Sequence, residues 1–312
     1  MAPVNDMTDT ERAARTSAAV DAGVGAARDL GLEVTDPAVL HDLFSVVVHL
    51  RPSPVVVRIP TVLPVTETPA TVAHRQSDEL AVTAWLDVAG VPVLRPSPLV
   101  PARPVQRGGF SMTFWEYVEE DRTAVPDYAA NAESTARLHR ALRDYPGELD
   151  FLATADPDGV AAHLDVLAGR PDLLPAADLA RARTEWAALE PAVRSRAVFE
   201  ARFPGVGLQA IHGDCPPANM FAGLDGARYA DFELVTQGPV EWDLAALGPE
   251  LEAAYDRGAA AEGIRGLRSD VLEFVNAVGV LRAITTLALV PQLPELAQYL
   301  QPVVEQWRDA SR

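Results

Sequence analysis

Two short segments of this 312-residue chain concentrate side chains that could carry chemistry. Residues 212–219 read HGDCPPAN, and residues 231–233 read DFE. Transfer of a phosphoryl group to a hydroxyl needs a carboxylate that orients the acceptor and takes its proton. It also needs hard oxygen ligands that hold magnesium on a triphosphate. Asp214 can supply the base, and the Asn219 amide and the Asp231 carboxylate can supply the metal ligands. The types and order of these residues therefore indicate phosphoryl transfer.

The other residues of the first segment have less direct roles. His212 belongs to the catalytic segment, and we expect it to hold the loop through hydrogen bonds instead of attacking a substrate. Cys215, beside the proposed base, is interpreted as a small buried residue that fills the loop. Any one of these residue types alone is a common turn former, so only the ordered set argues for catalysis. Asp231 would return towards Asp214 on the second strand of a tight hairpin.

Composition limits the classes of partner and compartment. The net charge of −18 and the pI of about 4.7 leave no global basic footprint, so we expect no nucleic-acid partner. The single cysteine allows no intrachain disulfide and fits a reducing cytoplasm. The first residues lack the apolar core of a secretory signal, and proline or charge breaks each apolar stretch short of the roughly 18 residues that span a bilayer. We therefore expect a cytoplasmic protein with no membrane partner.

The elements that must position these residues fall into two groups along the chain. Residues 45–50 and 55–59 are β-branched runs joined by a proline-rich turn, which predicts a hairpin. Near residue 120 the pattern changes to helices, which predicts an α+β fold of two lobes with a ligand-binding cleft between them. Further helices are expected at residues 8–30, 77–88, 127–143, 158–167, 176–188 and 190–201 and through 241–307, and further strands at 110–115 and on both sides of 224–226.

The pattern HGDxxxxN followed by DFE resembles the catalytic and metal-binding loops of the aminoglycoside phosphotransferase and choline kinase superfamily, whose fold is similar to that of protein kinases. The resemblance implies a small-molecule kinase that uses ATP and Mg²⁺ to phosphorylate a substrate hydroxyl. Residues 238–245, GPVEWDLA, resemble the family segment in which an aspartate, here Asp243, braces the catalytic loop. Asp243 and Glu233 are thus expected to support the site.

The N-lobe segments match the same superfamily in order. Residues 55–60, VVVRIP, resemble the strand that carries the ATP-binding cation, with Arg58 where lysine is usual; the chain contains no lysine. Glu79 lies in the segment that resembles the helix whose glutamate pairs with that cation. Glu116 and Val118 lie where the hinge to adenine is expected. The resemblance divides the chain into an N-terminal helical extension, a nucleotide-binding N-lobe and a catalytic C-lobe, at residues 1–34, 35–119 and 120–312.

Two departures from the family pattern leave a second hypothesis open. Residues 41–45 contain no glycine where the family has a glycine-bearing phosphate loop, and arginine is not interchangeable with lysine by default. A catalytically silent nucleotide-binding or regulatory protein would fit both changes, although it would not need Asp214, Asn219 and Asp231. A metal-dependent phosphoesterase would need more clustered His and Asp residues. If Arg58 is the ATP clamp, it should pair with Glu79; otherwise it is a solvated edge residue.

The acceptor is a hydroxyl-bearing small molecule whose identity the sequence leaves open. The residues after the second segment are rich in acids, and an acidic rim would suit a cationic acceptor such as an amino sugar, an aminoglycoside or an amino alcohol. The other interpretation is that most of these acids face solvent. The acids concerned are Glu241, Asp243, Glu250, Glu252 and Asp256.

Overall fold

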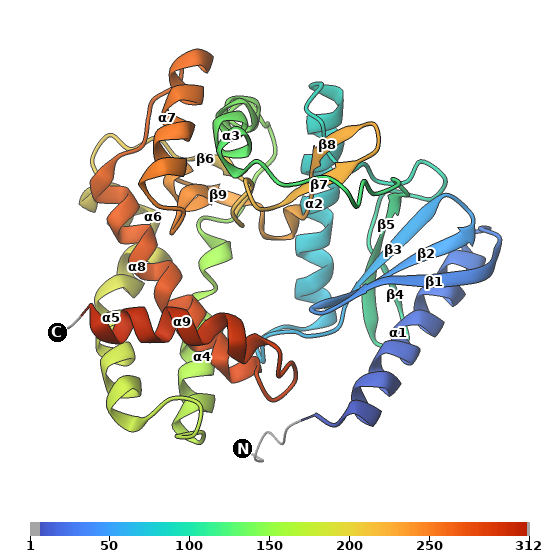
Figure 1. Cartoon of the computed structure of the whole chain (residues 1–312), viewed down its shortest axis with the longest axis horizontal. Helices are drawn as coiled ribbons and strands as arrows, with labels where there is room; N and C mark the ends of the chain where they lie inside the picture. The colour runs from blue at the N-terminus through green and yellow to red at the C-terminus, as the bar shows by residue number, and fades with distance from the viewer. Residues whose placement is uncertain (1–6, 311–312) are drawn as a thin grey trace.

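The computed structural model describes residues 7–310, and it has the two-lobed α+β architecture expected from the sequence. Figure 1 shows a β-rich lobe at the right, a helical lobe at the left, and the long helix α2 between them. The first lobe contains a five-stranded antiparallel sheet with the strand order β1-β2-β3-β5-β4. Its elements are α1 (Asp9–Asp29), β1 (Val34–Asp42), β2 (Ser45–Pro52), β3 (Val55–Pro60), α2 (Pro69–Val88), β4 (Val105–Arg107) and β5 (Phe110–Glu116).

The second lobe is built from helices with short strands and 3-10 turns between them. Its helices form one large apolar core. Its elements are α3 (Tyr128–Leu142), η1 (Ala153–Ala155), α4 (Pro157–Ala168), α5 (Ala176–Arg194), α6 (Arg196–Arg202), β6 (Gln209–Ile211), β7 (Met220–Gly223), β8 (Gly226–Tyr229), η2 (Phe232–Leu234), β9 (Thr236–Gly238), η3 (Val240–Leu244), α7 (Pro249–Glu262), α8 (Ser269–Thr285), η4 (Thr286–Leu289) and α9 (Leu296–Asp309).

The predicted hairpin is present as β2 and β3, which places Arg58 on a central strand of the sheet. Strand β1 was not predicted. Almost all of its side chains are exposed or half-buried, so it lacks the alternation that marks a strand, and Pro37 lies within it. Both features are typical of an edge strand, where one row of backbone groups needs no partner.

Helix α1 covers one face of the sheet. It begins with a capping box in which Thr8 and Glu11 satisfy each other's backbone amides. Its buried alanines, among them Ala19 and Ala27, pack with the inward residues of β2 and β3 in one core. The predicted N-terminal extension therefore shares its core with the N-lobe sheet; residues 1–6 of that segment lie outside the described residues.

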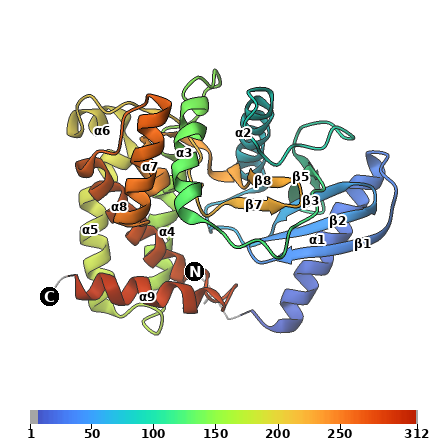
Figure 2. The same ribbon diagram turned by 45° about the horizontal axis from the view of Figure 1, so that its top comes forward.

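Helix α2 is longer than predicted, because it begins at Pro69 and not near residue 77. Thr68 caps it, and proline at the first helical position suits a helix start. Glu79 therefore lies in the middle of the helix. The C-terminal half of α2 buries Val82 and Leu86 against α3, β8 and η2 in a third core. Figure 2 shows α2 beside β7 and β8, so this helix ties the N-lobe to the segment that carries the catalytic residues.

Two C-lobe segments differ from the expectations. Helix α5 continues through Pro191 and breaks at Ser195, which caps α6, whereas a break near residue 189 was predicted. By length and composition, Ser269–Leu289 could cross a bilayer, which corrects the expectation that every apolar stretch is too short. In the structure 56% of an apolar 18-residue stretch of this segment is buried, and Val271 and Val278 lie in the C-lobe core.

The lobes meet again away from the connector between β5 and α3, where the start of α1 lies near the segment before α9 (Figure 1). The Met7 amide donates to the Pro291 carbonyl at 2.6 Å, and the Arg12 guanidinium pairs with the Glu295 carboxylate. We call these four residues the latch. It joins the start of α1 to the segment that precedes α9.

Candidate active site

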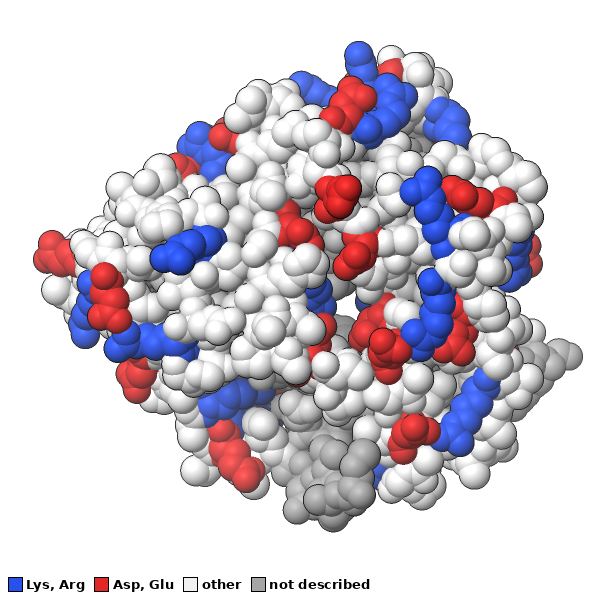
Figure 3. Space-filling view, turned by 180° about the vertical axis from the view of Figure 1, so that it is seen from behind, with Lys and Arg blue, Asp and Glu red and all other residues white. Residues whose placement is uncertain are grey.

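A cleft of about 1720 Å³ runs between the lobes and is lined by residues of both. Pockets for one drug-sized ligand occupy roughly 300–1,000 Å³, so this cleft has room for a nucleotide and a second molecule. Seen from behind, acidic and basic side chains gather around a hollow near the middle of the molecule (Figure 3). Asp214, Asp231 and Arg58 all line the cleft.

The catalytic loop between β6 and β7 has a backbone that only glycine permits at one position. Gly213 has φ of +87°, and a Cβ placed there would lie 1.9 Å from the backbone oxygen of Leu234. Cys215 and Asp231 also have positive φ, at 46° and 64°. Non-glycine residues in this region are uncommon and cluster at functional sites. The close approach brings the loop onto the segment that carries Asp231.

Asp243 braces this loop as the family resemblance implied. Its Oδ2 accepts from the His212 backbone amide at 2.8 Å, and its Oδ1 accepts from the Gly213 amide at 2.7 Å. His139 Nε2, on α3, lies 2.9 Å from Oδ2, and its Nδ1 is bonded to the Tyr255 hydroxyl at 2.9 Å. All these groups are buried, so the carboxylate fixes the loop from beneath.

His212 is a positioning residue in this structure. Its ring is fully buried, and Nε2 lies 2.8 Å from the Ala230 carbonyl, to which it must donate. The Asp214 amide donates to Nδ1 at 3.3 Å. Both ring nitrogens are therefore used to join the catalytic loop to the residue that precedes Asp231. The hydrogen-bonding role predicted for His212 agrees with these contacts.

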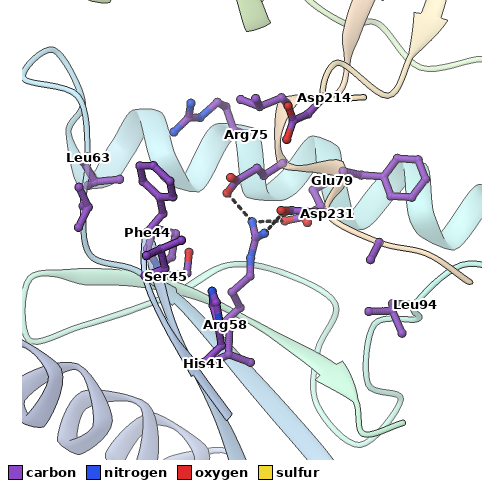
Figure 4. Close-up of a pocket in the computed structure, with 18 of the residues that line it drawn as sticks. His41, Phe44, Ser45, Arg58, Leu63, Arg75, Glu79, Leu94, Asp214 and Asp231 are labelled. Atoms are coloured by element: carbon purple, nitrogen blue, oxygen red, sulfur yellow. Dashed lines mark hydrogen bonds and ion pairs between the residues drawn. The ribbon is translucent and has the colours of Figure 1, made fainter. Parts of the chain in front are cut away.

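Asp214 points into the cleft from this loop, as Figure 4 shows. Burial raises the pKa of Asp214 above its usual range, and the neighbouring Asp231 carboxylate adds to the shift; the charges of His212 and Arg282 oppose it. The Asn219 amide nitrogen donates to the Asp214 backbone carbonyl and lies 3.3 Å from its carboxylate. A carboxylate with a raised pKa is a stronger base, which suits proton removal from a hydroxyl.

Arg58 is the centre of the charged cluster in the N-lobe wall of the cleft. Its Nη2 lies 3.3 Å from Glu79 and 2.7 Å from Glu233, and its Nη1 contacts Asp231 (Figure 4). The predicted ion pair with Glu79 is present, and Arg58 is not a solvated edge residue, because its side chain is 13% exposed. Burial alone would lower the pKa of Arg58, but the three carboxylates outweigh it and keep the guanidinium charged. Burial raises the pKa of Glu79 to about 8, although the positive charge of Arg58 acts in the opposite direction.

The proposed metal ligands offer the oxygen chemistry that magnesium needs. Asp231 presents a carboxylate that is 39% exposed in the cleft wall, and Asn219 donates through its nitrogen, which leaves its amide oxygen for a ligand. Within residues 7–310 no group of three or more His, Cys, Asp or Glu side chains could hold a metal alone. Magnesium usually takes one or two protein carboxylates and completes its shell with substrate phosphates and water, so this sparse donor set fits it.

The expected hinge lies at the end of β5, where the chain leaves the sheet. The Glu116 amide donates to Arg95, and the Glu116 carboxylate pairs with the Arg95 side chain at 2.7 Å. The Val118 amide donates to no group of the described chain, so it can donate to a ligand. Apolar side chains from both lobes line the same cleft, namely Val47, Val56, Leu94 and Phe221.

Three residues of the cleft were missed by the sequence reasoning. Arg75 lies one turn before Glu79 on the same face of α2 and pairs with Glu67 at 3.1 Å. Its i, i+4 spacing from Glu79 was a readable signal. His163 on α4 and Arg282 on α8 also line the cleft. No local pattern marks them, because their elements meet the catalytic loop only through the tertiary fold.

The acidic rim expected after the metal-binding segment is not part of the cleft. None of its five residues lines the cavity. Glu241 is fully buried in an ion pair with Arg265, and Asp256 accepts from the Leu267 amide at 2.8 Å. The expectation is wrong for a packing reason: η3 is buried beneath the catalytic loop, and α7 packs against α3.

The chain resembles known proteins in sequence pattern and in fold. It matches the phosphotransferase enzyme family over residues 44–276. Comparison with curated protein sequences finds no match. The fold is similar to that of the amicoumacin kinase hAmiN in complex with AMP-PNP and Ca²⁺, at 13% identity over 97% of this chain and 96% of that one, with a TM-score of 0.62.

Two further solved structures share the fold. One is the GDP complex of aminoglycoside 2'-phosphotransferase-IIIa, at 14% identity over 93% of this chain and 98% of that one, with a TM-score of 0.57. The other is the choline kinase LicA from Streptococcus pneumoniae, at 14% identity over 92% and 99%, with a TM-score of 0.55. The predicted protein-kinase-like fold is thereby confirmed. Because the family match spans more than half of the chain and includes both the Arg58 strand and the catalytic loop, the chain belongs to the phosphotransferase enzyme family.

Proposed function

We propose that this phosphotransferase is an ATP- and Mg²⁺-dependent kinase that transfers the γ-phosphoryl group to a hydroxyl of a small molecule. The observation that carries the proposal is the shared cleft: Asp214, Asp231 and the Arg58–Glu79 pair line one cavity. Asp214 is the base, Asn219 and Asp231 are the metal ligands, and Arg58 is the phosphate clamp oriented by Glu79. We also propose that the protein works in the cytoplasm, where ATP is abundant and its single thiol would stay reduced.

The nucleotide end of the cleft needs cations and a hinge donor. The Val118 amide can donate to the adenine, with the apolar side chains of both lobes against its faces. Arg58 and Arg75 lie on the wall where the phosphates would pass, and together they offer two guanidinium groups. This pair can replace the backbone amides that a glycine-bearing loop would present, since guanidinium binds phosphate oxygens in a fork.

The acceptor end of the cleft needs a base beside the reacting hydroxyl. Bound Mg²⁺ would supply positive charge that stabilises the phosphoryl oxygens and the leaving group. Asp214 orients the acceptor hydroxyl and takes its proton as the bond to phosphorus forms. Asp243 and His212 act through the loop, because they hold the backbone on both sides of the base. Catalysis then rests on positioning and electrostatics more than on covalent chemistry.

One observation favours the silent-protein alternative. Arg58 contacts Asp231 directly, so the cation occupies an oxygen that the proposed metal site requires. In an active enzyme the incoming triphosphate must draw Arg58 from Asp231 to the phosphates, while Glu79 and Glu233 keep hold of its other nitrogen. Nucleotide binding without magnesium-dependent turnover would favour the silent protein.

The test is substitution of the base. Asp214→Asn keeps the shape of the side chain but removes the proton acceptor, so kcat should fall by several orders of magnitude while ATP binding stays nearly unchanged. Acceptor-dependent ADP release across amino sugars, aminoglycosides, amino alcohols, nucleosides and hydroxy acids gives the first quantity, and calorimetry gives the second. Asp225→Asn, at the exposed tip of the β7–β8 hairpin, is the matched control. Retention of more than about a tenth of the wild-type turnover by Asp214→Asn would remove Asp214 as the base.

A further inference from the structure

Arg282 is a cation of the cleft that the proposed reaction does not use. It lies on α8 near the C-terminal end of the helix, and its side chain lines the cavity. Within the described chain its guanidinium makes no hydrogen bond and forms no ion pair with a carboxylate. Its nearest described ring contact is Trp242, at 5.7 Å from the ring centre.

Arg282 lies in the C-lobe wall of the cleft, on α8, which packs against α4. Burial lowers the pKa of Arg282, and the negative charges of Asp214 and of Asp156, at the start of α4, oppose that shift. The carboxylates that raise the pKa of Arg58 are different ones, on α2 and in the metal-binding segment. Arg282 and Arg58 therefore belong to different groups of charges, although both line the cleft. A molecule that offers its hydroxyl to Asp214 from the C-lobe side would meet Arg282.

His163, on the neighbouring helix α4, provides an independent sign of a ligand in the C-lobe wall of the cleft. It is 5% exposed, it lines the cavity, and its Nε2 has no hydrogen-bond partner in the described chain. Burial lowers the pKa of His163, so the ring is neutral at pH 7 and has one N–H to donate. A buried polar atom without a partner costs free energy unless a ligand supplies one.

The neighbouring polar groups leave Arg282 and His163 as the donors at this end. The hydroxyls of Thr285 and Thr286 both donate to the Arg282 carbonyl, at 3.0 and 2.8 Å, and the Thr154 hydroxyl donates to Gly213. One oxygen of Asp156 caps α4 by accepting from Gly159 at 3.0 Å. Two unpaired donors, one of them a planar cation, match a group with two anionic oxygens.

We propose, on the basis of the kinase function above, that the acceptor carries an anionic group, a carboxylate or a phosphate monoester, bound by Arg282 in a fork with His163 donating beside it. This subsite replaces the expected cationic preference with an anionic one. It fixes the acceptor by a charged group remote from the hydroxyl that reacts. Binding energy gained there orients the hydroxyl at Asp214.

The experiment compares glucose with three derivatives that each differ from it at one carbon: glucosamine, glucuronate and glucose 6-phosphate. Each is titrated by calorimetry into the full chain, with and without Mg-ADP. We expect glucuronate or glucose 6-phosphate to bind at least tenfold more tightly than glucose and glucosamine, and whichever of the two is tighter identifies the anionic group. Arg282→Gln should erase the preference, Arg282→Lys should restore part of it, and His163→Phe should weaken it.

Several outcomes overturn the proposal. They are tightest binding of glucosamine, equal or undetectable binding of all four, and a preference that survives Arg282→Gln. The control is Arg257→Gln, which removes an exposed arginine of α7 outside the cleft and should leave the preference intact. Failure of Mg-ADP to bind would count against the kinase function instead, and the sugar preference can still be measured without nucleotide.

Thermal stability separates a ligand-binding arginine from a structural one. Removal of an unpaired, partly buried charge relieves a desolvation cost, so Arg282→Gln should leave Tm unchanged or raise it. A structural arginine would lower Tm on substitution. A fall in Tm of Arg282→Gln relative to Arg257→Gln would therefore contradict the proposal, even if the sugar preference were also lost.

Discussion

Arg58 is a residue for which lysine would be a poor substitute in this site. A guanidinium presents a planar fork of donors, whereas an ammonium is a compact point charge. The fork lets Arg58 contact Glu79, Asp231 and Glu233 together, from two different elements. The third residue of the DFE segment, Glu233, supplies an additional carboxylate. The fork of Arg58 can contact it as well as Glu79 and Asp231, so arginine in place of lysine suits a site that contains Glu233. The clamp is also part of what holds the lobes in register.

Arg58→Ala should therefore impair both ATP binding and stability. Its loss leaves the buried Glu79 and the partly exposed Asp231 and Glu233 without a cation. Breaking a fully buried pair costs about 3–5 kcal/mol of unfolding free energy, and we expect a smaller loss here because solvent screens two of the three carboxylates. We expect KM for ATP to rise as well, and Arg58→Lys to recover part of each. Adding Glu79→Gln to Arg58→Ala should recover stability but not KM. Denaturant unfolding and steady-state kinetics give the two quantities. Normal KM in Arg58→Ala would show that Arg58 is not the clamp.

Cys215 gives a second prediction at this scale, because it is the only thiol of the chain. Burial raises the pKa of Cys215 to about 11. The thiolate is the reactive form, so at pH 8 the folded protein should react with iodoacetamide on the order of a hundredfold more slowly than an ordinary thiol. The rate should rise with pH towards 11 and rise sharply on unfolding. Rapid alkylation of the folded protein at pH 8 would contradict the raised pKa of Cys215, which is half-buried in this structure.

At the scale of elements, the catalytic loop is a short segment held from three sides. The Asp243 carboxylate accepts from two of its amides, His212 joins it to Ala230 directly after β8, and Gly213 allows it to approach η2. None of these restraints touches the proposed reacting atoms. They decide where Asp214 stands, and a shift of about 1 Å in such a group can cost a hundredfold in rate.

Gly213→Ala should lower activity by more than the positive φ of this position alone would explain. The added Cβ would meet the Leu234 carbonyl at 1.9 Å, and backbone cannot move aside as a side chain can. Gly226→Ala is the control, since Gly226 also has positive φ, at 126°, but has nothing within 4 Å of the added carbon. We expect Gly213→Ala to lower both kcat and Tm much more than Gly226→Ala. Equal effects of the two substitutions would show that φ, not the close approach, is limiting.

The sequence allowed prediction of those elements whose pattern is local. The β2–β3 hairpin has β-branched runs and a proline turn, and the catalytic loop has a fixed order of polar residues. Strand β1 could not be predicted, because an edge strand with exposed side chains has no alternation. The start of α2 was missed because Thr68 and Pro69 mark it and the apolar periodicity does not. Arg282 was hidden for another reason: it reaches the cleft only because α8 packs against α4 and η3 in the tertiary fold.

At the scale of the whole molecule, two lobes with separate cores are joined by a third core. The N-lobe core includes α1 and the sheet, and the C-lobe core includes most of the helices. The third core, around Val82 and Leu138, couples α2 to α3 and to the strand before Asp231. Helix α2, which carries Glu79, and the metal-binding segment therefore share one core. The latch adds a contact far from this core.

The latch should govern release of ADP more than it governs folding. Glu295→Gln removes an exposed ion pair, which is worth less than about 1 kcal/mol of unfolding free energy. We expect a small change in stability and a faster dissociation of ADP, measured by stopped-flow fluorescence. Glu200→Gln is the control, because it breaks a similarly exposed pair within α6 that joins no lobes. If both variants release ADP at the wild-type rate, the latch does not limit opening.

The latch also makes the interlobe joint a closed ring, because the lobes are connected at both ends of the cleft. The ring opens only when the contacts of the latch break, and these include an exposed pair of opposite charges. Dissolved salt screens such charges over about 10 Å at 0.1 M, so ionic strength sets how readily the ring opens. The product would then escape more slowly in dilute buffer than in concentrated salt. The salt concentration of the solution would therefore regulate how long ADP stays bound to this protein.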